Sequence, residues 1–262
     1  MLLILCIDSH KNLIGHLLKL GEEMLINGAE VSRVEDALKR LFFSYGCKNV
    51  DVFVVTSCII LTVTDNTGES FTRTVRITSG KTDFDRLTKL NSLSRHICKN
   101  TPEADEVSNL LEKTLENTKD GKSAFYKKCV GSVLASGAFA VFFGGHITDL
   151  LLAAFVAVCV SLFELFFKKK DSNIPVYYFL CTLFSGVLTI CLCRLFGKAS
   201  TDMIMIGFIM LVIPGLAFTN AARDFLLGDT ITGALRMLES VLQAAFIAGG
   251  IALSIIIMRG AV

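Results

Sequence analysis

The feature that most constrains this chain is the series of long apolar stretches in its second half. We count about five stretches of membrane-spanning length there, since a helix needs roughly 20 apolar residues to cross a bilayer. They lie near residues 129–145, 147–167, 174–196, 202–221 and 238–258. The connecting segments GGHITD and KKKDSN are short, so neighbouring helices are expected to run antiparallel. The sequence therefore predicts a five-helix transmembrane domain over residues 125–262.

The first half of the chain is much more polar. The whole chain is 52% hydrophobic with a mean hydropathy of +0.59. Its charges are nevertheless concentrated in residues 1–128, which hold 18 of the 26 Lys and Arg residues and 17 of the 24 Asp and Glu residues. The division indicates a separate N-terminal domain over residues 1–120. A net charge of +2 gives no reason to expect a nucleic-acid partner. The opening MLLILCI is too short for a span and lacks the basic region and cleavage site of a signal peptide.

The positive residues that flank the apolar stretches predict the orientation in the membrane. Eight Lys and Arg residues lie on one side and three on the other. The larger group is Lys122, Lys127, Lys128, Lys168, Lys169, Lys170, Arg223 and Arg236, and the smaller is Arg194, Lys198 and Arg259. Because positive charge is retained on the cytoplasmic side, we expect the N-terminal domain in the cytoplasm and the C-terminus outside a cell inner (plasma) membrane.

Residues 1–120 show the pattern of a small α+β domain. Apolar spacing predicts helices over 12–26 and 30–45, strands near 49–56, 58–64 and 69–77, and helices over 83–98 and 101–118. DNTG (65–68) is typical of a hairpin turn, and Ser32 with Glu35 has the spacing of a capping box. Thr101 is expected as the N-cap of the last helix, with Pro102 at its first position. The fold class is thus an α-helical membrane protein with an N-terminal cytoplasmic α+β domain.

The usual catalytic and metal-binding signatures are missing from the sequence. SGKT (79–82) ends like a phosphate-binding loop, but Val75 stands where the first glycine would be. The patterns G-x-S-x-G and H-E-x-x-H do not occur. Nine cysteines are scattered without metal-ligand spacing, and an odd number argues against a disulfide framework. We therefore expect no enzyme activity, no cofactor and no metal.

Ionisable groups inside predicted spans need a functional or structural reason. Glu164, near the inner end of the second span, either pairs with Lys168 one turn later or takes part in proton coupling. Glu239 begins the fifth span, with Gln243 one turn away, and is the second candidate for proton coupling. Small residues in the first span, from Gly131 to Ser136, allow close helix packing.

The segment LVIPGLAFTNAARDFLLGDT (211–230) interrupts the fourth span. Pro214 removes a backbone donor and clashes with the preceding turn, so a kink or break is expected there. Irregular backbone at membrane depth is tolerated where it lines a polar cavity or is buried in protein. Asn220 offers donors and an acceptor, and Arg223 and Asp224 pair with each other or with a substrate. Spacing alone supports either a substrate site at Pro214 and Gly215 or a plain kink with a helix ending at the interface.

Two segments together resemble the signature stretches of the threonine/serine exporter family. They are NGAEVSRVEDALKRLFFSYG (27–46) and LVIPGLAFTNAARDFLLGDTITG (211–233), and the resemblance covers nearly the whole chain. The matching residues are Gly28, Glu30, Arg33, Glu35 and Asp36 in the first stretch, and Pro214, Gly215, Asn220, Arg223, Asp224, Gly228 and Asp229 in the second. The chain looks like the longer half of the split form of this family, because it ends after the fifth predicted span.

The resemblance implies a subunit of a secondary exporter driven by the proton-motive force. Its cargo would be threonine- or serine-type amino acids or a dicarboxylate such as succinate, and a second, small membrane subunit would complete it. Pro214, Gly215, Asn220, Arg223 and Asp224 would then bind or gate the substrate. Glu30, Arg33, Glu35 and Asp36 would line the cytoplasmic entrance. The alternatives are a membrane-anchored hydrolase and a membrane assembly or sensor subunit without transport of its own.

Overall fold

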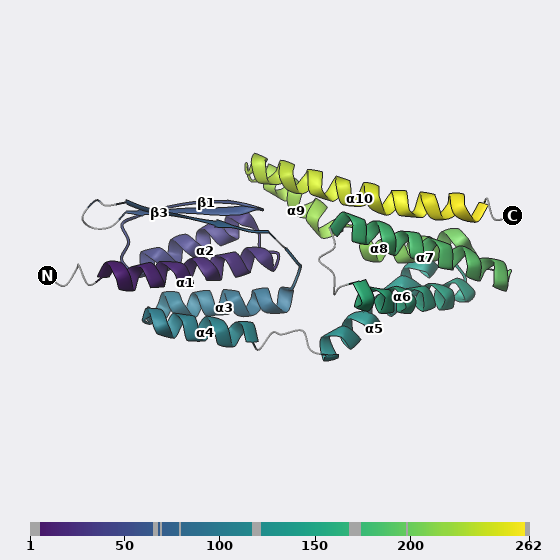
Figure 1. The fold of residues 1–262 in the computed structure, drawn as a ribbon, viewed down its shortest axis with the longest axis horizontal. Helices are drawn as coiled ribbons and strands as arrows, with labels where there is room; N and C mark the ends of the chain where they lie inside the picture. Colours follow the sequence, from purple (N-terminus) through teal and green to yellow (C-terminus); the bar gives the residue numbers. More distant parts are fainter. Residues whose placement is uncertain are drawn as a thin grey trace. The chain divides into compact units, whose positions relative to one another are not determined.

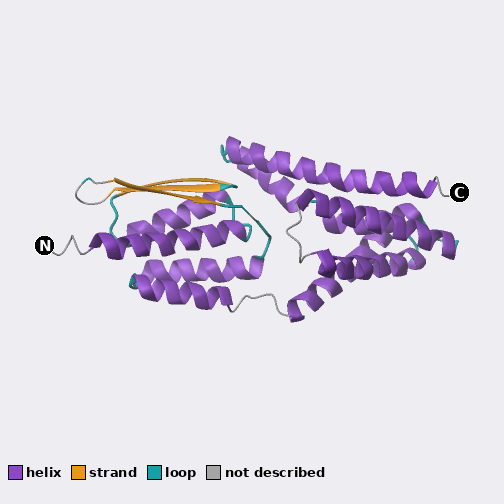
Figure 2. Ribbon diagram, in the orientation of Figure 1, coloured by secondary structure: helices purple, strands orange, loops and turns teal. Residues whose placement is uncertain are grey.

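A computed structural model describes residues 6–64, 68, 70–78, 80–116, 122–167, 174–197 and 199–259. Contacts divide the chain into two compact units. The first unit comprises Met1–Lys119 and Arg223–Leu235, and the second comprises Asp120–Ala222 and Arg236–Val262. Helices and one three-stranded sheet make up the described regular structure, as the fold class predicted (Figure 2).

The first unit has three layers (Figure 1). Its helices are α1 (Cys6–Ile26), α2 (Val31–Ser44), α3 (Phe84–Asn100) and α4 (Ala104–Glu116), and its strands are β1 (Asn49–Val55), β2 (Cys58–Thr64) and β3 (Ser70–Arg76). The strands form an antiparallel sheet in the order β1-β2-β3, with Val52 opposite Leu61 and Leu61 opposite Arg73. Helices α1 and α2 lie between this sheet and the pair α3 and α4.

The core of the first unit follows the predicted periodicities. In β1 and β2 every second residue is buried, so that one face of the sheet packs against the helices. Leu17, Leu38 and Leu90, from three different helices, are all fully buried. The predicted helices and strands are therefore confirmed, with α1 beginning earlier than expected. Of the predicted hairpin turn, residues 65–67 lie outside the described residues.

Two predicted helix caps are wrong. Thr101 does not begin a helix: it ends α3 in a left-handed conformation (φ 42°), and its amide donates to the carbonyl of Ile97. The following helix starts only at Ala104. The capping box of Ser32 and Glu35 does not form either, because Glu30 occupies the N-cap position of α2 and Glu35 bonds to a strand instead.

The second unit consists of helices. They are α5 (Lys122–Phe142), α6 (Ile147–Phe167), α7 (Ile174–Phe196), α8 (Thr201–Val212), α9 (Gly215–Leu226) and α10 (Thr230–Arg259), the last two of which also enter the first unit. By length and composition, α6, α7 and α10 can cross a membrane, and α8 with α9 makes a fourth candidate if the bent pair is one span. About five spans were expected; the difference is α5, which does not meet this test over its described residues.

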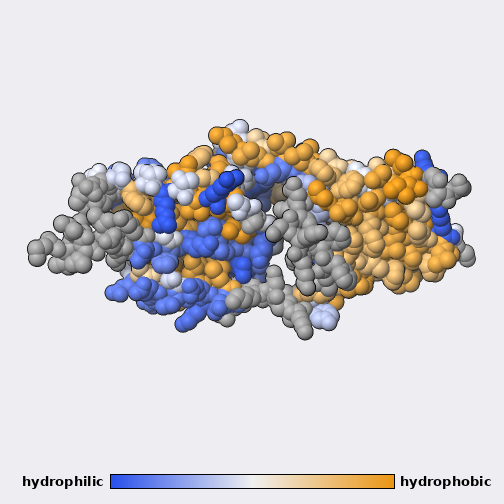
Figure 3. Space-filling model, in the orientation of Figure 1, coloured by the Kyte–Doolittle hydropathy of each residue, from blue (hydrophilic) through white to orange (hydrophobic). Residues whose placement is uncertain are grey.

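Close helix packing in the second unit depends on glycines. A Cβ on Gly207 of α8 would lie 2.5 Å from the carbonyl oxygen of Ser136 in α5, and one on Gly250 of α10 would lie 2.5 Å from that of Phe179 in α7. These distances leave no room for a side chain. Gly131, by contrast, has nothing within 4 Å of such a Cβ, so its predicted packing role is not seen. The face of this unit that Figure 3 shows is largely apolar.

Candidate functional site

The first signature stretch begins at a tight turn between α1 and α2. Gly28 has φ +93°, a conformation that favours glycine, and the amide of Ala29 donates to the carbonyl of Met24 over 3.0 Å. The amide of Lys81 donates to the carbonyl of Ile26 over 2.7 Å. The turn is therefore held by the segment that precedes α3, which fixes the position of Glu30 at the start of α2. SGKT thus has a structural role at Lys81, and Ser79 lies outside the described residues.

An ion pair joins the two signature stretches. Arg223 Nη1, in the last turn of α9, lies 2.5 Å from Glu30 Oε1, at the N-cap of α2. Both residues belong to the first unit, although 193 positions separate them in the sequence. The sequence left Arg223 to pair either with its neighbour Asp224 or with a substrate, and the structure pairs it with Glu30. Asp224 is 1% exposed.

Glu35 lies one turn further along α2 and faces the sheet. Its Oε1 accepts a hydrogen bond of 3.0 Å from the amide of Val54, on the edge strand β1. Burial raises the pKa of the Glu35 carboxyl, and the charge of Asp229 raises it further; the Val54 amide and Lys39 act in the opposite direction. Glu35 is thus a partly buried carboxyl that interacts with the charge of Asp229, in the turn that follows α9, and its pKa lies above the ordinary value.

The other two predicted entrance residues point elsewhere. Asp36 forms the expected pair with Arg40, 3.0 Å apart, on the exposed face of α2. Arg33 is exposed. Of the four acidic and basic residues predicted together, the structure therefore brings only Glu30 and Glu35 to the segment after α9.

The second signature stretch contains the expected break. Helix α8 ends at Val212, α9 begins at Gly215, and the two axes differ by 53°. Asn220 is half-buried, and its side chain makes no hydrogen bond with the residues that the structure describes. The boundary between the two units falls after Ala222. Pro214, Gly215 and Asn220 consequently belong to the second unit, whereas Arg223 and Asp224 belong to the first.

A residue outside the predicted set contacts the break. Gln243 of α10 places its side-chain amide 3.4 Å from the carbonyl oxygen of Val212, the last residue of α8. The sequence noted Gln243 only as the neighbour of Glu239, which is exposed. A polar amide within an apolar stretch was the signal that could have selected it.

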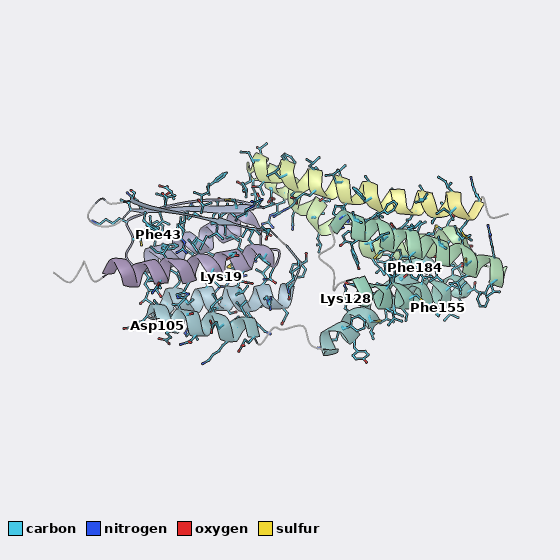
Figure 4. All side chains as sticks on the ribbon, viewed as in Figure 1. Lys19, Phe43, Asp105, Lys128, Phe155 and Phe184 are labelled. Atoms are coloured by element: carbon cyan, nitrogen blue, oxygen red, sulfur yellow. The ribbon has the colours of Figure 1, made fainter. Side chains whose placement is uncertain are left out.

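Glu164 forms an ion pair with a lysine of a neighbouring helix, and its predicted pairing with Lys168 stays untested. Lys128 Nζ, in α5 (labelled in Figure 4), donates to both carboxylate oxygens of Glu164, in α6, over 2.5 and 2.8 Å. Lys168 lies outside the described residues. The pair links two helices that run side by side.

Asp149, in the first turn of α6, is a buried structural residue. Its carboxylate accepts one hydrogen bond from the amide of His146 and one from the amide of Ser200, each 2.8 Å long. Because Ser200 is the N-cap of α8, this carboxylate ties the start of α6 to the start of α8.

One comparison with known proteins identifies a family. The model of the ThrE family, described as "Putative threonine/serine exporter", matches residues 16–258. This match includes both units and both signature stretches. No curated protein and no solved structure matches the chain.

Proposed function

Because the chain belongs to the threonine/serine exporter family, we propose that it is one subunit of a secondary exporter that the proton-motive force drives. Its cargo is a small polar metabolite, either a threonine- or serine-type amino acid or a dicarboxylate such as succinate. The subunit lies in the plasma membrane with its N-terminal domain in the cytoplasm and its C-terminus outside. A second, small membrane subunit completes the transport path.

The ion pair between Glu30 and Arg223 carries this proposal. It connects the α+β unit to the end of the helix that begins at the break, where Pro214 and Gly215 leave backbone groups without helical partners. Alternating access moves one part of a transporter against another around the cargo, and this pair holds the last turn of α9 within the first unit. We assign Arg223 and Glu30 to the gate, Asn220 with Asp224 to its lining, and Glu35 to the cytoplasmic entrance.

Efflux measurements test the proposal. Cells that express the full chain together with the candidate small subunit are loaded with labelled serine, threonine or succinate, and release is followed with and without an uncoupler. We expect uncoupler-sensitive release that needs both proteins and that falls in an Asn220→Ala and Arg223→Ala double variant. Undiminished release by that variant would remove the proposed gate, and release that ignores the uncoupler would remove proton coupling.

A further inference from the structure

Strand β3 is the more accessible edge of the sheet in the first unit. The strand order is β1-β2-β3, so β1 and β3 each have one edge that β2 does not pair. The β1 edge is partly occupied, because α2 packs against this strand and the Glu35 carboxylate accepts the amide of Val54. Along β3, by contrast, every residue except Val75 is exposed. Within the described part of the chain, β3 is therefore the edge that is open to another strand.

The register shows which backbone groups of β3 point away from the sheet. The amide of Ile77 donates to the carbonyl of Ser57, which the register places directly opposite. Bonded and non-bonded pairs alternate in an antiparallel ladder, so Arg73 bonds to β2 whereas the residues on either side of it do not. The residues whose amides and carbonyls point outward are Ser70, Thr72, Thr74 and Arg76. No hydrogen bond from the described residues reaches these outward backbone groups.

Two arginines of β3 lack an acidic partner. Arg73 and Arg76 are exposed, and neither forms an ion pair with a residue that the structure describes. Arg73 lies on the face of the sheet that packs against the helices and reaches α1, where a Cβ on Gly15 would lie 3.2 Å from its Nη1. Arg76 lies on the opposite face, because side chains alternate along a strand. The open edge thus presents positive charge on both faces, and β3 contains no acidic residue.

We propose that the open edge of β3 binds an extended acidic segment of a partner protein, which adds a fourth strand to the sheet. Backbone hydrogen bonds to the outward groups hold the added strand, and side chains on its alternate faces select the partner. Carboxylates opposite Arg73 and Arg76 lie three positions apart in such a strand. The partner segment therefore has two acidic residues separated by two others, for which β-branched residues favour the extended conformation. This interface is separate from the residues assigned to the gate and does not depend on the cargo.

A second copy of this chain does not fit the edge. Pairing of two β3 strands would bring two arginines from each copy, and no acidic residue, into one seam. Like charges on facing strands are destabilising, and charged side chains on an edge strand prevent non-specific pairing. The positive charge of β3 thus disfavours pairing with itself and favours a negatively charged strand.

Peptide binding to the full chain in nanodiscs of neutral lipid tests the proposal. The probe is a fluorescent peptide as long as β3, built from threonine and valine, with two glutamates three positions apart. A matched peptide carries lysines in place of the glutamates. We expect the acidic peptide to bind with a Kd below about 1 mM and roughly tenfold or more tightly than the basic one. Equal affinities, or no binding of the acidic peptide at that concentration, would overturn the proposal.

Charge variants locate the contact. Arg76→Glu should raise the Kd of the acidic peptide about fivefold or more, because it turns an attraction between facing strands into a repulsion. Arg95→Glu is the matched control, since it makes the same charge change at an exposed position of α3, which α1 and α2 separate from the sheet. It should leave the Kd within about twofold. Equal losses in the two variants would show an effect of net charge alone and refute the edge site.

Thr74→Pro tests the backbone contact. It removes an outward amide, while the ladder to β2 stays intact because the amide of Thr74 does not point to β2. We expect the acidic peptide to lose about tenfold or more in affinity while the melting temperature stays unchanged. An acidic peptide with N-methylated alternate amides makes the same test without altering the protein, and should bind equally weakly. Undiminished binding of this peptide would overturn strand addition.

The oligomeric state tests the excluded occupant. Sedimentation of the wild type and of Thr74→Pro in the same detergent compares their masses. We expect the two masses to agree. A wild-type dimer that Thr74→Pro dissociates would identify a second copy as the occupant of the edge and overturn the acidic partner.

Discussion

Reversing the two charges of the Glu30–Arg223 ion pair tests whether the pair stabilises the protein by more than the attraction between its charges. The charged atoms are 2.5 Å apart, but the side chains are 23% and 55% exposed, so the attraction itself contributes only about 0.2–1 kcal/mol. The position of the charges adds a second effect. Glu30 stands at the N-terminus of α2 and Arg223 in the last turn of α9, where each charge interacts favourably with its helix dipole by about 0.3–1 kcal/mol.

A charge swap separates the two contributions. Glu30→Arg combined with Arg223→Glu restores the attraction but places each charge at the wrong helix end. Turning two favourable dipole interactions into unfavourable ones changes the free energy by about 1–4 kcal/mol. The swap should therefore remain clearly less stable than the wild type, even though its charges are complementary. Each single reversal makes one dipole interaction unfavourable and turns the attraction into repulsion, which together amount to about 1–4 kcal/mol, so it should lose about as much stability as the swap.

Amide hydrogen exchange of the full chain in detergent measures the loss of stability at the start of α2. The amide of Val34, which donates to the carbonyl of Glu30, reports on the first turn of α2. We expect its protection to fall in the swap by about fivefold or more, since 1 kcal/mol corresponds to roughly that factor. The control variant swaps Asp36 and Arg40, an exposed ion pair within the same helix. It should leave the protection of the Val34 amide nearly unchanged. Wild-type protection in the Glu30–Arg223 swap would refute the dipole argument.

Three further predictions concern packing and pH. Gly207→Val should destabilise the full chain by about 1–3 kcal/mol in thermal unfolding, because its side chain would meet a backbone carbonyl of α5, whereas Gly131→Val should change little. Equal effects at the two positions would contradict the packing seen here. Burial raises the pKa of Tyr45 from 10.0 to about 12, so the stability that its neutral form supplies below pH 10 is lost as the pH rises through 12. Tyr45→Phe should remove this loss, at a cost of about 0.5–1.5 kcal/mol for the missing hydrogen bond. For Glu35 the raised pKa means that stability is complete below the ordinary value of 4.5 and falls as the pH rises through the folded-state pKa. Glu35→Gln keeps an acceptor for the Val54 amide and should therefore raise the melting temperature at pH 7, with no gain below pH 4; a gain at both pH values would point to another cause.

Local patterns predicted most of the elements in this chain. The period-two alternation of β1 and β2 and the helical spacing of leucines in α1 and α2 depend only on burying one face, which neighbouring residues in the sequence decide. The break at Pro214 was equally predictable, since proline lacks the amide that a continuous helix needs. Helix ends were less predictable: Thr101 ended α3 instead of beginning α4, because a cap depends on contacts that lie beyond the local pattern.

The sequence by itself thus determined the apolar helices, the α+β unit, the break in the fourth predicted span and the resemblance to an exporter family. Only the tertiary structure decided the partners of the charged groups. Arg223 meets Glu30 rather than its neighbour Asp224, and Glu164 meets Lys128 across a helix pair. Gln243 contacts the break from a helix that begins after it. The physical reason is that helical periodicity fixes which face a side chain occupies, whereas packing between distant segments decides what stands opposite that face.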